Sequence, residues 1–201
     1  MKKHFLYLAC LAATASCADE PDYTPLSFAV VDDRIVATGE IDGTSLDVFE
    51  DLIENHPEIR ALVLQNIGGS LDDEANVEFS RVIRNMGFTT VVPSDGLVAS
   101  GGTDLFLAGT KRIIETGACV GVHSWAAEDF TATDLPRAST EHNRYLDYYE
   151  DIDIAPEFYW FTIEAAPADE MHWMTSHEID QYGLSTASVE TLSAAAICNN
   201  R

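Results

Sequence analysis

The stretch that decides the fold is Leu97-Val98-Ala99-Ser100-Gly101-Gly102-Thr103-Asp104-Leu105-Phe106-Leu107. It runs through a glycine pair into an apolar segment, which predicts a tight turn that opens a buried helix. Ser100 stands at that turn, where its hydroxyl can face a cleft. The next amide, that of Gly101, then lies at the helix N-terminus, where donors are unpaired and negative charge is favoured. A serine beside a glycine is also typical of an ordinary helix cap.

Short apolar runs and helical patterns alternate on both sides of this turn. Residues 61–64 form a continuous apolar run, as expected of a strand buried on both faces of a parallel sheet. Further strands are predicted at 26–31, 34–40, 89–92, 112–114 and 119–123, and helices at 46–56, 73–86, 133–166 (interrupted near Pro156) and 176–184. This alternation predicts one α/β domain over residues 19–201 with a mainly parallel sheet.

Two further candidate catalytic groups, a glycine pair and a histidine, lie at the ends of predicted strands. Gly68 and Gly69 come shortly after the run 61–64, and paired glycines let the backbone approach a ligand closely. The Gly69 amide could then supply a second oxyanion donor beside that of Gly101. His123 ends a predicted strand, at the sheet edge where sites gather, and its imidazole could accept the Ser100 proton. A plain turn and a structural histidine are the alternative interpretations.

The order of these pieces resembles the ClpP serine peptidases, within the wider ClpP/crotonase superfamily. The resemblance covers roughly residues 30–185, and its blocks are 34–41, 61–70, 99–109, 120–125 and Tyr182-Gly183-Leu184. It implies a stack of βαβ units that forms the main sheet. It also implies that Ser100 attacks a peptide carbonyl, that His123 is its base, and that the Gly69 and Gly101 amides form the oxyanion hole.

The third catalytic position departs from the family pattern. The family places an aspartate shortly before the Tyr-Gly-Leu block, where ungapped alignment puts Met171, which is no useful acceptor. Asp169 and Glu170 stand next to it, and a shift of one or two residues would restore an acid. Asp169 is preferred on side-chain type. If neither acid reaches His123, a slower dyad or an inactive protein results.

The resemblance also bears on assembly. Residues 133–166 would fall in the helical handle through which such subunits pack together. A homo-oligomer, trimeric or larger, is therefore expected. Tyr159, Trp160 and Phe161 within this segment are interpreted as packing residues.

The N-terminus reads as a signal peptide of residues 1–18. Lys2 and Lys3 precede a short, mostly apolar run over 4–15, and Ala18 ends a small-residue cleavage motif. A lipid anchor at Cys17 stays open, although Thr14 replaces the preferred leucine. Both alternatives predict a periplasmic or secreted protein.

Two cysteines remain after removal of such a signal. Cys119 and Cys198 form an even pair in an oxidising compartment, and we predict that they are disulfide-bonded. His172 and His177 have no common zinc spacing, so no metal site is predicted. With 34 acidic against 11 basic residues, the chain is not expected to bind nucleic acid.

The sequence therefore predicts an exported serine hydrolase without cofactor. We expect a peptidase that acts by acyl transfer on a polypeptide or other acyl substrate. The alternative is an inactive ClpP-fold binding or scaffold protein, which the missing aspartate near Met171 motivates. A crotonase-type enzyme acting on coenzyme A thioesters is disfavoured by the export signal and the acidic surface.

Overall fold

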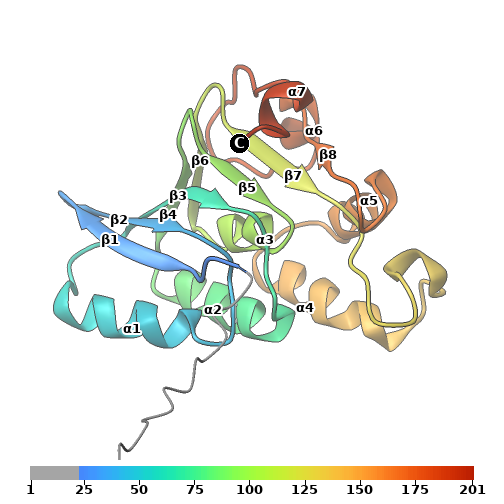
Figure 1. Cartoon of the computed structure of the whole chain (residues 1–201), viewed down its shortest axis with the longest axis horizontal. Coiled ribbons are helices and arrows are strands. Elements are labelled where there is room, and N and C mark those ends of the chain that lie inside the picture. Colours follow the sequence, from blue (N-terminus) through green and yellow to red (C-terminus); the bar gives the residue numbers. More distant parts are fainter. Residues whose placement is uncertain (1–22) are drawn as a thin grey trace, which may run out of the picture.

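The computed structural model describes residues 23–201, in which eight strands form one sheet (Figure 1). The strands are β1 (Ser27–Val31), β2 (Arg34–Thr38), β3 (Ala61–Ile67), β4 (Thr89–Val92), β5 (Leu97–Ala99), β6 (Lys111–Ile114), β7 (Cys119–Val122) and β8 (His172–Trp173). The helices are α1 (Ser45–Asn55), α2 (Asp73–Asn85), α3 (Gly101–Leu107), α4 (Asn143–Asp151), α5 (Pro156–Ala165), α6 (Ser176–Gln181) and α7 (Ala195–Cys198). The predicted signal peptide, 1–18, and the lipid-anchor alternative at Cys17 lie outside the described residues.

The sheet forks along β3. The first three residues of β3 pair in parallel with β4, and β4 pairs in parallel with β6. Asn66 and Ile67, at the end of β3, pair instead with β5, which continues in parallel to β7. Only β1 and β8 run antiparallel to their neighbours. The prediction of an α/β domain with a mainly parallel sheet is confirmed.

Helices α1 and α2 lie along one side of the sheet (Figure 1). Each places a fully buried phenylalanine against it, and the rings of Phe49 and Phe79 lie 5.1 Å apart between centroids. Helix α2 begins where the Asp72 carboxylate accepts the amides of Glu74 and Ala75, both at 3.0 Å. Burial of these apolar helix faces holds α1 and α2 against the sheet.

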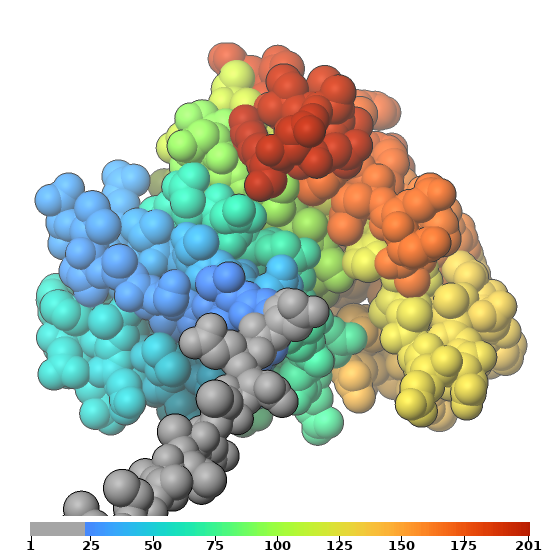
Figure 2. Space-filling view, viewed as in Figure 1, coloured from blue at the N-terminus to red at the C-terminus, as the bar shows by residue number. Residues whose placement is uncertain are grey.

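The last third of the chain packs against the flank of these units. Figure 2 shows its yellow and orange segments beside the green and cyan ones, with the red C-terminal segment at one end. Helices α4 and α5 contact each other, and the Tyr148 hydroxyl of α4 donates to the Asp104 carbonyl of α3 at 2.7 Å. Within residues 23–201 no helix is long and apolar enough to cross a membrane.

Some local predictions were wrong. Residues 133–142 are not helical beyond two short 3-10 turns, because the Thr131 and Asp134 side chains form a capping box that holds a separate turn. Pro156 stands at the first turn of α5, where its missing N–H costs nothing. Strands β5 and β8 were missed, since three and two residues are too few to show a period.

The C-terminal tail is held by a covalent bond. Cys119 of β7 and Cys198 of α7 form the predicted disulfide, with their Cα atoms 5.7 Å apart. Both cysteines are buried in a small cluster with Leu97 and Ala99, against which Trp173 packs. The bond thus ties the end of the chain to the β5–β7–β8 edge of the sheet.

Candidate active site

Three neighbouring parallel strands end at the same edge of the sheet. β3 is followed by Gly68 and Gly69, β5 by Ser100, and β7 by His123. In the register of the sheet, Ile67 is paired with Val98, and Ala99 with Gly121. The carboxyl ends of parallel strands are where open α/β sheets place ligands. The fork in the sheet therefore brings these three segments together.

Ser100 has a strained backbone. Its φ of 52° and ψ of −127° are rare for a residue with a side chain. The turn is held because the Ser100 amide donates to the Gly121 carbonyl at 3.1 Å, and the Thr103 amide donates to the Ser100 carbonyl at 2.8 Å. The Ser100 hydroxyl caps no amide of α3, so the helix-cap alternative does not describe this residue. A strained serine between a strand and a helix is typical of a nucleophile.

The strain at Ser100 predicts a stability difference. Glycine adopts this conformation freely. The free energy of unfolding of Ser100→Gly is therefore expected to be about 1 kcal/mol higher than that of Ser100→Ala. Urea denaturation of the two variants measures the difference. As a control, the exposed Ser94, which has no positive φ, should show no gain with glycine over alanine. Equal stabilities at position 100 would mean that its backbone is relaxed.

Two glycine amides flank the serine. A Cβ on Gly69 would lie 3.5 Å from the Ser100 Cβ and 3.8 Å from its Oγ. A Cβ on Gly101 would collide with the Ser70 side chain, so only glycine fits there. Neither amide has a hydrogen-bond partner within residues 23–201. Free donors on both sides of a serine hydroxyl suit a developing oxyanion.

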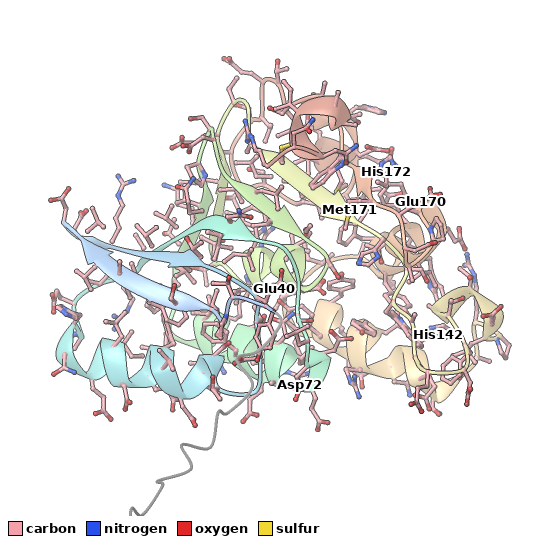
Figure 3. All side chains as sticks on the ribbon, in the orientation of Figure 1. Glu40, Asp72, His142, Glu170, Met171 and His172 are labelled. Atoms are coloured by element: carbon pink, nitrogen blue, oxygen red, sulfur yellow. A yellow bond between two sulfur atoms is a disulfide. The ribbon has the colours of Figure 1, made fainter. Side chains whose placement is uncertain are left out.

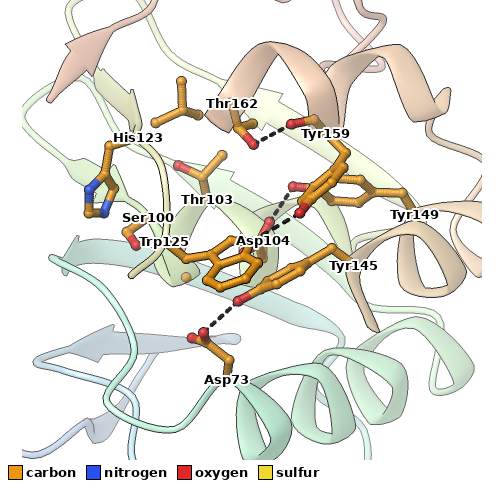
Figure 4. A pocket seen from close by; sticks show the side chains of 12 residues that line it. Asp73, Ser100, Thr103, Asp104, His123, Trp125, Tyr145, Tyr149, Tyr159 and Thr162 are labelled. Carbon is orange, nitrogen blue, oxygen red and sulfur yellow. Dashed lines mark hydrogen bonds between the residues drawn. The ribbon is translucent and has the colours of Figure 1, made fainter. Parts of the chain in front are cut away.

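His123 is oriented by a backbone group. Its Nδ1 lies 2.9 Å from the Ala168 carbonyl oxygen, which can only accept a hydrogen bond. Nδ1 therefore carries the proton, and Nε2 keeps a free lone pair. His123 and Ser100 line the same cavity (Figure 4), although no hydrogen bond joins them in the described structure. Such bonds often tighten only in the substrate complex.

The residues weighed for the third position lie on the segment before β8. Asp169 and Glu170 line an open hollow together with His123, but neither carboxylate hydrogen-bonds to the imidazole in the described structure. Figure 3 shows Glu170 and Met171 close to the β7–β8 edge. Met171 packs over Gly121, where a Cβ would lie 2.7 Å from its sulfur. The role of Ala168 in orienting His123 has no signal in the sequence, because the group that it contributes is a backbone carbonyl, which every residue has.

The far wall of the cavity was not predicted from the sequence. Its side chains are mostly polar or aromatic and come from α2, α3, α4, α5 and the segment after β7: Asp73, Thr103, Asp104, Trp125, Tyr145, Tyr149, Tyr159 and Thr162. Burial raises the pKa of Asp104 to about 7, against a lowering by the Tyr149 hydrogen bond. One signal was available, because Asp104 lies four residues after Ser100 and thus on the same helix face.

The two histidines weighed above as metal ligands, His172 and His177, do not line this cavity. His172 Nε2 is 3.0 Å from the Glu178 carboxylate, on the first turn of α6. In the described part of the chain, no three His, Cys, Asp or Glu side chains gather as metal ligands would.

No protein-family model matches this chain, and no curated protein matches it. Solved structures do share its fold. A mutant of the 1510-N membrane-bound stomatin-specific protease, in complex with a substrate peptide, has a TM-score of 0.50 at 16% identity over 77% of this chain and 73% of that one. The ClpP protease catalytic domain from Plasmodium falciparum has a TM-score of 0.50 at 16% identity, over 78% and 82%.

Crotonases share the fold as well. A putative enoyl-CoA hydratase/isomerase from Legionella pneumophila has a TM-score of 0.51 at 13% identity, over 88% of this chain and 73% of that one. The predicted ClpP/crotonase-like fold is thus confirmed. Because the neighbours include both peptidases and coenzyme A enzymes, the fold alone does not select the chemistry.

Proposed function

We propose that this protein is a serine hydrolase, a peptidase that cleaves a polypeptide or other acyl substrate without a cofactor. One observation carries the proposal: Ser100 is held in a strained turn between two unpartnered amides, in a cavity that His123 also lines. Strain at a residue with a side chain is retained where that side chain has a use.

The proposed mechanism is acyl transfer. Ser100 Oγ attacks the substrate carbonyl while His123 Nε2 accepts its proton, and the Gly69 and Gly101 amides bind the oxyanion of the tetrahedral intermediate. The protonated imidazole then gives its proton to the leaving amine. Water, deprotonated by His123, releases the acyl group from Ser100. The Ala168 carbonyl stabilises the imidazolium less than a carboxylate would, so we expect slower turnover than in a full triad.

The setting that we propose is outside the cytoplasm, as a homo-oligomer of three or more subunits. The Cys119–Cys198 disulfide supports this location, because such bonds persist in oxidising compartments. A coenzyme A enzyme is disfavoured, since 34 acidic against 11 basic residues repel a polyanionic ligand.

A fluorophosphonate probe tests the proposal. The probe should label the intact protein covalently, and Ser100→Ala should abolish the labelling because the attacking oxygen is gone. Ser94→Ala, which removes an exposed serine outside the cavity, is the matched control and should label like the unmodified protein. A folded protein that the probe never modifies would leave the scaffold alternative standing.

A further inference from the structure

The cavity beside Ser100 is lined by polar and aromatic side chains. It holds about 430 Å³ of empty space, including its opening to solvent. Figure 4 shows Ser100 and His123 at one side, the tyrosines at the other, and Asp104 between them.

Asp104 offers an unused acceptor to this cavity. Its Oδ1 accepts the Tyr149 hydroxyl at 2.6 Å, while its Oδ2 has no hydrogen-bond partner within residues 23–201. Surrounding protein shields the carboxyl group from solvent, which raises its pKa, although part of its surface stays open to the cavity. A donor or a cation from a ligand would relieve this desolvation.

Asp73 adds a second carboxylate to the same cavity. Both of its oxygens are engaged, one by the Ser70 hydroxyl and the other by the Tyr145 hydroxyl. Its negative charge also raises the pKa of Asp104. Asp73 therefore contributes to the field in the cavity, and Asp104 keeps the free oxygen.

Three aromatic rings stack along the cavity wall. The Tyr145 ring lies 6.0 Å from the ring of Trp125 and 5.5 Å from the ring of Tyr159, between centroids and nearly parallel to both. All three side chains line the cavity, and no lysine or arginine does so in the described chain. Two carboxylates, with no basic side chain in the lining of the described chain, favour a cation over an anion or a plain apolar group.

Resting on the function proposed above, we propose that this cavity is a specificity pocket for a cationic side chain on the acyl side of the scissile bond. Lysine fits this description best, with its ammonium at Asp104 and its methylene chain along Trp125, Tyr145 and Tyr159. The expected substrates are polypeptides cleaved after lysine.

Matched peptide aminomethylcoumarins test the proposal. In the series acetyl-Ala-Ala-X-aminomethylcoumarin, kcat/KM should be at least about tenfold higher for lysine than for norleucine, which has the same shape without the charge. Asp104→Asn should bring this ratio close to one, while the exposed Asp47→Asn on α1 should leave it unchanged. Faster cleavage of norleucine or phenylalanine substrates would overturn the inference.

The pH dependence of the same ratio gives a second readout. Ionisation of Asp104 near pH 7 should raise the preference for lysine as the pH increases, and the ratio cancels effects that both substrates share. The other titratable groups around Asp104 are Asp73 of α2, Tyr145, Tyr148 and Tyr149 of α4, and Tyr159 of α5. Each of these tyrosines has its pKa raised by burial and stays neutral in this range. A ratio that is flat between pH 5.5 and 8.5 would speak against Asp104.

A binding measurement separates this inference from the proposed catalysis. Calorimetry on the Ser100→Ala protein should show tighter binding of acetyl-Ala-Ala-Lys than of acetyl-Ala-Ala-norleucine, with the difference lost in Ser100→Ala/Asp104→Asn. This holds whether or not Ser100 is a nucleophile. If the fluorophosphonate labels Ser100 but lysine has no advantage in binding or cleavage, the pocket assignment fails and the hydrolase stands.

Discussion

Replacing His123 by alanine is expected to lower kcat/KM for peptide cleavage about a thousandfold. Within residues 23–201 the imidazole is the base that lines the Ser100 cavity from the strand-end side, and a positioned general base contributes about 10²–10⁴-fold. Residual activity should remain, because the Gly69 and Gly101 amides still bind the oxyanion. The decisive measurement is the rate of Ser100 phosphonylation by a fluorophosphonate, followed in the variant and in the unmodified protein.

The two acids near His123 provide the comparison. Asp169→Asn and Glu170→Gln should each change kcat/KM less than about fivefold, because the Ala168 carbonyl and not a carboxylate engages Nδ1. A loss in either variant as large as that in His123→Ala would show that a carboxylate takes over Nδ1 when substrate binds. Such a result would restore the triad that the resemblance implies.

Breaking the disulfide is expected to cost about 4 kcal/mol of unfolding free energy. The bond closes a segment with a sequence separation of 79, and loops of this length restrict the unfolded chain strongly. For a domain of this size, that corresponds to a fall in Tm of roughly 10 °C. Thermal unfolding with and without a reducing agent measures it directly.

The control for the disulfide is the double variant Cys119→Ala/Cys198→Ala. It should melt at the lower temperature and be indifferent to reducing agent. Helix α7 would then be held mainly by contacts with β8, among them the hydrogen bond from Trp173 Nε1 to Asn199. If the native protein presents two free thiols and reductant leaves its Tm unchanged, the bond is absent in solution.

The sequence by itself determined the fold class and the strand-end half of the site. Local patterns carried these predictions: the apolar run at 61–64, the glycine pairs and the turn at Ser100. Each pattern indicates the conformation of its own segment. In a parallel sheet, segments that follow neighbouring strands lie at one edge. The strand before Ser100 is too short to predict, so the meeting of Gly69, Ser100 and His123 is an expectation that the resemblance to the ClpP peptidases supplies.

Only the tertiary structure decided what surrounds them. The tyrosines of α4 and α5 reach the cavity because α4 folds back on α3 and α5 packs against α4. The contact of α4 with α3 joins residues more than forty apart, which no local pattern encodes. The Ala168 carbonyl that orients His123 could not be predicted from the sequence either, because every residue has the same backbone carbonyl. Asp104 acquires its raised pKa only when other elements exclude water from it. Hydrophobic periodicity indicates which face of a helix or strand is buried, but not which other element packs against that face. The pocket is lined by side chains from several such elements, so it could not be predicted from periodicity.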